Sequence, residues 1–205
     1  MRMKSKKRML HTLLCLLLIL TLIPTPVYAA SKSETAVRKQ TVKFLKQVKK
    51  YSEKGVTNCF LPKNMRKSFD MYPQSSKQGQ VVRSLQKKYF QYDIKSISVK
   101  GKKAAVKVKA TYYDGYAVFT NAFWDVVQYS LSHPNLTDVE YDKYLARYQK
   151  KYIKQYGKNL TSKTVTISFT KYKGKWKIKN INTKLDDMLN CRFTCALRKI
   201  EKQLK

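Results

Sequence analysis

Asp125 is the carboxylate of greatest chemical interest, because it stands inside an otherwise apolar run, AVFTNAFWDVVQYSL. At helical spacing, Asn121 and Gln128 fall on the same face as Asp125. This polar stripe has two interpretations: the solvent side of an amphipathic helix, or the polar part of a pocket that aromatic side chains enclose. The second interpretation predicts a ligand pocket formed by Tyr112, Phe119, Asn121, Trp124, Asp125 and Gln128.

The histidine content limits proton-transfer chemistry. Of the 2 histidines, His11 lies near the N-terminus and His133 precedes Pro134, where a turn is expected. A multi-histidine metal site is therefore excluded, and a Ser-His-Asp triad is disfavoured. The motifs GxSxG, GxxxxGK[ST] and GxGxxG do not occur in the sequence. We predict no catalytic residue, no metal site and no cofactor.

Cys59, Cys191 and Cys195 are the candidate disulfide residues. In an oxidising compartment, three cysteines predict one disulfide with one thiol left over. A bridge from Cys59 to either of the other two would fix the C-terminal helix to the loop after the first helix. The sequence has no CxxC pair, so the spacing does not favour zinc.

Tyr144, Tyr148, Tyr152 and Tyr156 recur every four residues and form a stripe along one helix. We interpret the stripe as a packing face whose rings lie on the sheet. The alternative is a surface on which bases or sugars stack, because lysines and Arg147 surround it.

Residues 1–29 have the pattern of a cleavable secretory signal peptide. The basic segment MRMKSKKR is followed by an apolar run over residues 9–23 and by Pro24. Ala29 fits the small-residue rule for cleavage, which makes Ala30 the first residue of the mature chain. The apolar run is shorter than the roughly 20 residues that a membrane-spanning helix needs, so a retained anchor is the lesser alternative. We expect a secreted or cell-surface-associated protein in which residues 30–205 form one domain.

The charge balance is strongly basic, with 44 Lys and Arg residues against 12 Asp and Glu residues and a formal net charge of +32. Most of this excess lies after residue 29. A field of that size attracts polyanions with little regard for their identity. It predicts an anionic cell-wall polymer or membrane surface as partner, with a merely solubilising lysine coat as the alternative.

Helical periodicity comes first along the mature chain. Apolar residues at helical spacing predict helices over 33–54, ended by Gly55, over a short stretch after Pro62, and over 76–90. A helical insertion is expected over about 115–158, between two segments of strand pattern. A last helix should run from Thr183 to the C-terminus.

Period-two alternation marks two hairpins. Val106 and Val108 alternate with lysines after a turn at Gly101, and a second pair of strands turns at Gly174 and leads into Trp176. The fold class that follows is α+β: a cone-like curved antiparallel sheet of two hairpins, with N-terminal helices, a helical insertion between the hairpins and a C-terminal helix. The candidate polyanion-binding lysines on the outer side of this sheet are Lys107, Lys109, Lys175, Lys177 and Lys179.

Two segments carry a resemblance to a known family. The strand pairs DIKSISVKGKKAAVKVKATYY and TVTISFTKYKGKWKIKN, after three helices, resemble the cone-shaped fold of nuclear transport factor two, especially its secreted branches in Gram-positive bacteria. KGKWKI at 173–178 is the most telling piece, and the topology spans roughly residues 33–190. The resemblance implies a cone with an interior pocket. That superfamily includes isomerases, dehydratases, ligand binders and scaffolding modules, so the fold does not decide the function.

These patterns predict a non-enzymatic, exported, basic binding domain that engages anionic envelope components through its sheet lysines, with a cone interior free for a small apolar ligand. The first alternative is an isomerase or dehydratase that uses Asp125 and a cone tyrosine, roles that the family's isomerase branch gives to a carboxylate and a tyrosine. The second is an extracellular nucleic-acid binder, which the sequence favours less. The sequence leaves the oligomeric state open.

Overall fold

The computed structural model describes residues 31–62 and 75–205, and Lys32–Lys205 form one compact unit. The expected signal peptide at 1–29 and the short helix expected after Pro62 lie outside the described residues. Within the described ranges, no helix combines the length and the apolar character that crossing a membrane requires.

Helix α2 (Lys32–Lys50) forms because apolar residues recur at helical spacing and give it one buried face, which includes Val37, Phe44 and Leu45. The helix ends earlier than the sequence predicts. Tyr51 has a φ of 50°, and the chain then starts the short helix α3 (Glu53–Thr57), which contains Gly55 and which the Ser52 side chain caps. Helix α4 (Lys77–Tyr89) confirms the helix predicted over 76–90.

The sheet has four antiparallel strands in the order β1-β2-β3-β4: β1 (Gln91–Lys100), β2 (Lys103–Tyr113), β3 (Leu160–Tyr172) and β4 (Lys175–Ile178). Gly101 and Gly174, with φ of 55° and 75°, form the two hairpin turns, where the left-handed backbone suits glycine. The two hairpins pair through β2 and β3, in register from Lys103 opposite Thr170 to Tyr113 opposite Leu160. On the far side of β4, Phe60 forms a parallel bridge with Ile178.

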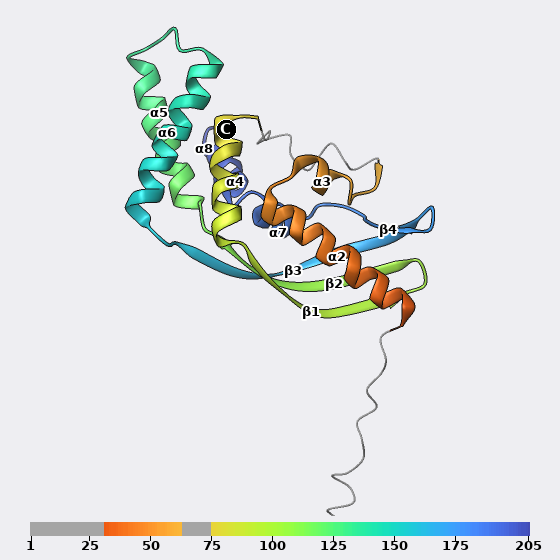
Figure 1. The fold of residues 1–205 in the computed structure, drawn as a ribbon. Helices are drawn as coiled ribbons and strands as arrows, with labels where there is room; N and C mark the ends of the chain where they lie inside the picture. The colour runs from red at the N-terminus through yellow and green to blue at the C-terminus, as the bar shows by residue number, and fades with distance from the viewer. Residues whose placement is uncertain (1–30, 63–74) are drawn as a thin grey trace, which may run out of the picture. The chain divides into compact units, whose positions relative to one another are not determined.

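Helices α2, α4 and α7 pack on the inner face of the sheet (Figure 1): α2 contacts β1 and β4, α4 contacts β2, and α7 contacts β3. The inner positions of the central strands, such as Val106, Val108 and Ile167, are 0% exposed. Strict alternation in β2 and β3 therefore buries one face against helices and leaves the other polar. The predicted fold class, α+β with a curved antiparallel sheet of two hairpins, is confirmed.

The helical insertion consists of α5 (Tyr116–Leu131) and α6 (Asp138–Tyr156), which pack against each other. Thr137 and Glu140 form a capping box at the start of α6, and Gly157 ends that helix, as predicted. The tyrosine stripe of α6 is a packing face, but its ring contacts are with α5: Tyr129 and Tyr144 have ring centroids 4.4 Å apart. The prediction that these rings lie on the sheet is wrong, because α6 packs on α4 and α5.

The C-terminal segment forms two helices, α7 (Thr183–Leu189) and α8 (Phe193–Gln203), where the sequence predicts one. Cys191 and Arg192 separate them with φ of 51° and 61°, a left-handed conformation that interrupts a helix. The Arg192 guanidinium forms an ion pair with Asp114, which stabilises the break next to the start of α5. The Arg198 side chain in α8 reaches back to both carboxylates of α7, Asp186 and Asp187.

Candidate anion-binding face of the sheet

The outer face of the sheet is a grid of lysine, serine and threonine side chains, which the register builds row by row. Ser96 and Thr166 lie on either side of Lys107, and Asp93 and Thr164 lie on either side of Lys109. The next two rows run from Ser98 through Ala105 to Ser168, and from Lys100 through Lys103 and Thr170 to Lys177. No helix of the described residues covers this face (Figure 1).

A hollow of about 420 Å³ lies on this face, near the turn between β1 and β2. The small side chain of Ala105 lies between Ser98 and Ser168, which leaves space over the middle strands. The backbone N–H of Lys179 donates to the carbonyl of Ser168 at 2.8 Å, which places Lys179 at the end of the same row. The lining residues are Ser98, Lys100, Lys103, Ala104, Ala105, Ser168, Phe169, Lys179 and Asn180.

The hollow offers hydrogen-bond donors and positive charge. Its side-chain polar groups are ammonium, hydroxyl and amide groups, and none of its lining residues in the described ranges is a carboxylate. The acidic position of the grid, Asp93, forms an ion pair with Lys95 at the bulge of β1. This set of groups suits phosphate or carboxylate oxygens, because each oxygen can accept a charge-assisted hydrogen bond.

The five predicted lysines do not form one patch. Lys107 and Lys109 are exposed on the outer face, and Lys179 lines the hollow. Lys175 lines a separate groove beside α2, and Lys177 is half-buried with its ammonium donating to the carbonyl of Asn58.

Sequence reasoning missed Lys100 and Lys103, together with the two serines and Asn180. The alternation of β2 carried the signal for Lys103, since it shares the parity of Lys107. Ser168 of β3 could not be placed near Lys103 without knowledge of the register between the two hairpins.

The predicted ligand pocket is divided between the core and the surface. Tyr112 and Phe119 are buried, and the Phe119 ring lies 5.9 Å from the Phe193 ring of α8. Trp124 is 42% exposed, and Gln128 is also exposed. The Phe119 ring therefore packs against an aromatic ring of α8 in the core.

Asp125 faces α6. Its carboxylate accepts hydrogen bonds from the Lys151 ammonium at 3.2 Å and from the Tyr152 hydroxyl at 2.9 Å. The hydrogen bond to Asp125 raises the pKa of Lys151. Asn121 extends the same polar seam by donating to the hydroxyl of Tyr156. The polar stripe of α5 thus serves helix packing.

The three candidate cysteines are free thiols, so the predicted disulfide is wrong for this structure. Cys59 lies beside β4, where its carbonyl accepts from Ile178. Cys191 lies at the break between α7 and α8, where its carbonyl accepts from Gly115. Burial raises the pKa of both thiols, while Cys195 is half-exposed.

Comparison with known proteins gives little further guidance. No family model matches the chain, and no curated protein matches it. A solved structure described as "a putative lipoprotein (ycdA)" from Bacillus subtilis is similar at 16% identity and a TM-score of 0.37. The match covers 58% of this chain and 38% of that protein, and a likeness at this level does not establish a shared fold or function.

Proposed function

We propose that this protein is an exported binding domain that holds an anionic polymer of the cell envelope on the outer face of its sheet. The observation that carries the proposal is the uncovered grid of lysines and hydroxyl groups, with a hollow that no carboxylate lines. The signal-peptide pattern of residues 1–29 supports export. The curved sheet of two hairpins supports the proposal that the fold is of the nuclear transport factor two type.

The outer-face lysines are close enough for their positive charges to attract the same anionic polymer. Lys107 and Lys109 are two residues apart on β2, which is about 7 Å along a strand. That distance is shorter than the Debye length, about 10 Å at 0.1 M salt. A single exposed lysine contributes less than about 1 kcal/mol to a surface ion pair, so binding has to come from several lysines on one repeating anion. A polymer of phosphodiesters or carboxylates meets that requirement.

The alternatives have less support from the geometry. An isomerase would need the Asp125 carboxylate free to take a proton from a substrate, whereas Lys151 and Tyr152 both engage it. A nucleic-acid binder would use the same lysines, but we identify no row of exposed aromatic rings beside them on the described outer face on which bases could stack.

The proposal predicts salt-sensitive binding to a wall polymer. The test uses purified protein that contains all of Lys32–Lys205. It is titrated with polyglycerol phosphate and, separately, with single-stranded DNA of equal phosphate content, at a series of salt concentrations. We expect affinity for polyglycerol phosphate to fall steeply with salt, because each bound phosphate releases counterions. We also expect that affinity to match or exceed the affinity for DNA at each salt concentration.

Binding to polyglycerol phosphate that does not depend on salt would contradict the electrostatic mechanism. Clear preference for DNA at matched salt would replace the envelope polymer by nucleic acid as partner. Neutral dextran serves as the control ligand, and it should not bind at any salt concentration.

A further inference from the structure

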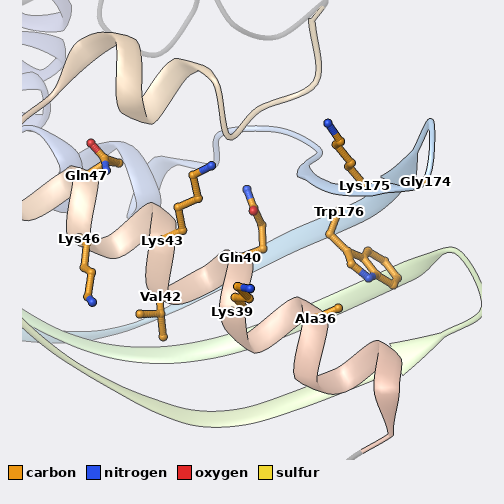
Figure 2. A pocket seen from close by; sticks show the side chains of 10 residues that line it. All are labelled: Ala36, Lys39, Gln40, Val42, Lys43, Lys46, Gln47, Gly174, Lys175 and Trp176. Atoms are coloured by element: carbon orange, nitrogen blue, oxygen red, sulfur yellow. The ribbon is translucent and has the colours of Figure 1, made fainter.

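A second basic groove lies between α2 and the hairpin of β3 and β4 (Figure 2), with a volume of about 590 Å³. Lysines line it from both sides, three from α2 and Lys175 from β4. The Trp176 side chain extends from β4 toward Ala36 of α2 (Figure 2). Its lining residues are Ala36, Lys39, Gln40, Val42, Lys43, Lys46, Gln47, Gly174, Lys175 and Trp176.

The groove follows from the two-sided character of α2. One stripe of the helix, which includes Phe44 and Val48, is buried in the core. The adjacent stripe repeats every three or four residues from Ala36 to Gln47 and lines the groove. On the other side, the alternation of β4 turns Trp176 inward, so that 6% of its surface remains exposed.

The floor and the rim of the groove differ in chemistry. Ala36, Val42 and Trp176 are apolar, and the lysine side chains add methylene stems that can cover an apolar surface while their charged ends reach water. In Figure 2, Gln40 and Lys43 of α2 and Lys175 of β4 point to one side, whereas Val42 and Lys46 point to the other side of α2. Among the residues that the structure describes, no carboxylate lines the groove. Apolar contact and uncompensated positive charge therefore lie within one cavity.

We infer that this groove binds a single-chain amphiphile with an anionic headgroup, a carboxylate or a phosphate on an alkyl chain. The ammonium groups of Lys39, Lys43 and Lys175 meet the headgroup, and the alkyl chain lies over Ala36 and Trp176. A ligand with charge alone would leave the apolar floor exposed to water, and a neutral alkyl chain would leave the lysines uncompensated. The inference does not rest on the proposed function, because the outer-face hollow has a different lining.

The chain provides its own reporter for this site. It has 2 tryptophans, Trp124 and Trp176, and Trp124 lies on α5, away from the groove lining. In a Trp124→Phe background, fluorescence reports Trp176 alone. Titration with dodecanoate and with dodecyl phosphate, both kept below their micelle concentrations, should shift the Trp176 emission saturably. Dodecanol, which has the alkyl chain without the charge, and inorganic phosphate, which has the charge without the alkyl chain, should not shift the emission.

Two variants locate the binding. Replacing Lys39, Lys43 and Lys175 by glutamine should weaken binding about tenfold, from the loss of several weak charge contacts. A matched control replaces Arg38, Lys49 and Lys50, exposed basic residues of α2 outside the groove lining, and should leave the affinity within about twofold. Ala36→Phe, which fills the groove without changing its charge, should abolish the emission shift. Circular dichroism verifies that each variant is folded.

The inference fails if the control weakens binding as much as the groove variant, or if Ala36→Phe binds normally. It also fails if inorganic phosphate alone saturates the site. The outer-face variant Lys103→Gln/Lys107→Gln/Lys109→Gln should lose polyglycerol phosphate binding but bind dodecanoate as the unmodified protein does. A failure of one proposed site is therefore distinguishable from a failure of the other.

Discussion

Tyr113 at the end of β2 shows how a single side chain can lower stability without disturbing the fold. The residue is 0% exposed, and its hydroxyl has no hydrogen-bond partner among the described residues. Its ring lies 5.5 Å from that of Tyr89. A buried hydroxyl that forms no hydrogen bond loses its bonds to water and gains none in exchange.

Tyr113→Phe should therefore raise the free energy of unfolding at neutral pH by about 1 kcal/mol, since the ring packing remains and the unpaired hydroxyl is removed. Urea denaturation measures the change. Tyr152→Phe is the contrasting variant, because its hydroxyl donates to Asp125, and it should be neutral or destabilising. A destabilised Tyr113→Phe protein would show that the hydroxyl has a partner after all.

The pH dependence of stability tests the same residue. Burial is the main cause that raises the pKa of Tyr113 to about 12, with Tyr89 and Cys191 adding to the shift. In the unfolded chain tyrosine ionises near pH 10. Between about pH 10 and 12 the folded state keeps a proton that the unfolded state has lost, so stability is intact below pH 10 and falls as the pH rises. The slope of unfolding free energy against pH should be shallower in Tyr113→Phe, and an unchanged slope would contradict the assignment.

At the scale of elements, the contact between Gly115 and α8 joins the insertion to the C-terminal segment. Gly115 precedes α5, and its backbone N–H donates to the carbonyl of Cys191 at 2.9 Å. A Cβ atom at this position would lie 1.8 Å from a carbon of the Phe193 ring and 2.9 Å from the Cys191 carbonyl oxygen. Both contacts are closer than a real Cβ atom allows, so the Phe193 ring, which packs on Phe119, and the backbone at Cys191 would have to shift.

Gly115→Ala should lower the free energy of unfolding by about 1–3 kcal/mol, because the added methyl group overpacks this contact. Chemical denaturation of a double-mutant cycle with Phe193→Leu separates the ring from the backbone: the smaller side chain should recover part of the loss. Strictly additive effects of the two substitutions would show that Phe193 is not the obstacle.

The elements were predictable wherever one periodicity held over the whole segment. The strands around Val106 and Ile167 alternate cleanly, so their inner and outer faces followed from the sequence. The two helix errors fall at Tyr51 and Cys191, non-glycine residues that adopt positive φ and are buried in the core. No local sequence signal marks such positions.

The binding surfaces were less predictable than the elements. A lysine's strand parity is visible in the sequence, and it placed Lys107 and Lys109 correctly. Whether Lys175 faces the open sheet or a groove beside α2 depends on how the β4 edge meets that helix, which is long-range information. In the same way, the packing of α5 against α6 and α8 determines that Tyr112 lies in the core and that Asp125 lies between α5 and α6.

At the scale of the whole molecule, the net charge of +32 means that almost any part of the surface attracts a polyanion. We propose more narrowly that the polymer is held on the outer face of the sheet. Binding through the overall net charge and binding through one face are distinguished by variants that lose the same number of charges at different places on the surface.

The most direct test compares two triple variants in binding to polyglycerol phosphate at one moderate salt concentration. The first carries Lys103→Gln, Lys107→Gln and Lys109→Gln on the outer face, and the second carries Lys143→Gln, Lys150→Gln and Lys154→Gln on exposed positions of α6. The account predicts about tenfold weaker binding for the outer-face variant and a change within about twofold for the α6 variant. Equal losses in the two variants would contradict it, because binding would then follow total charge and not the sheet face.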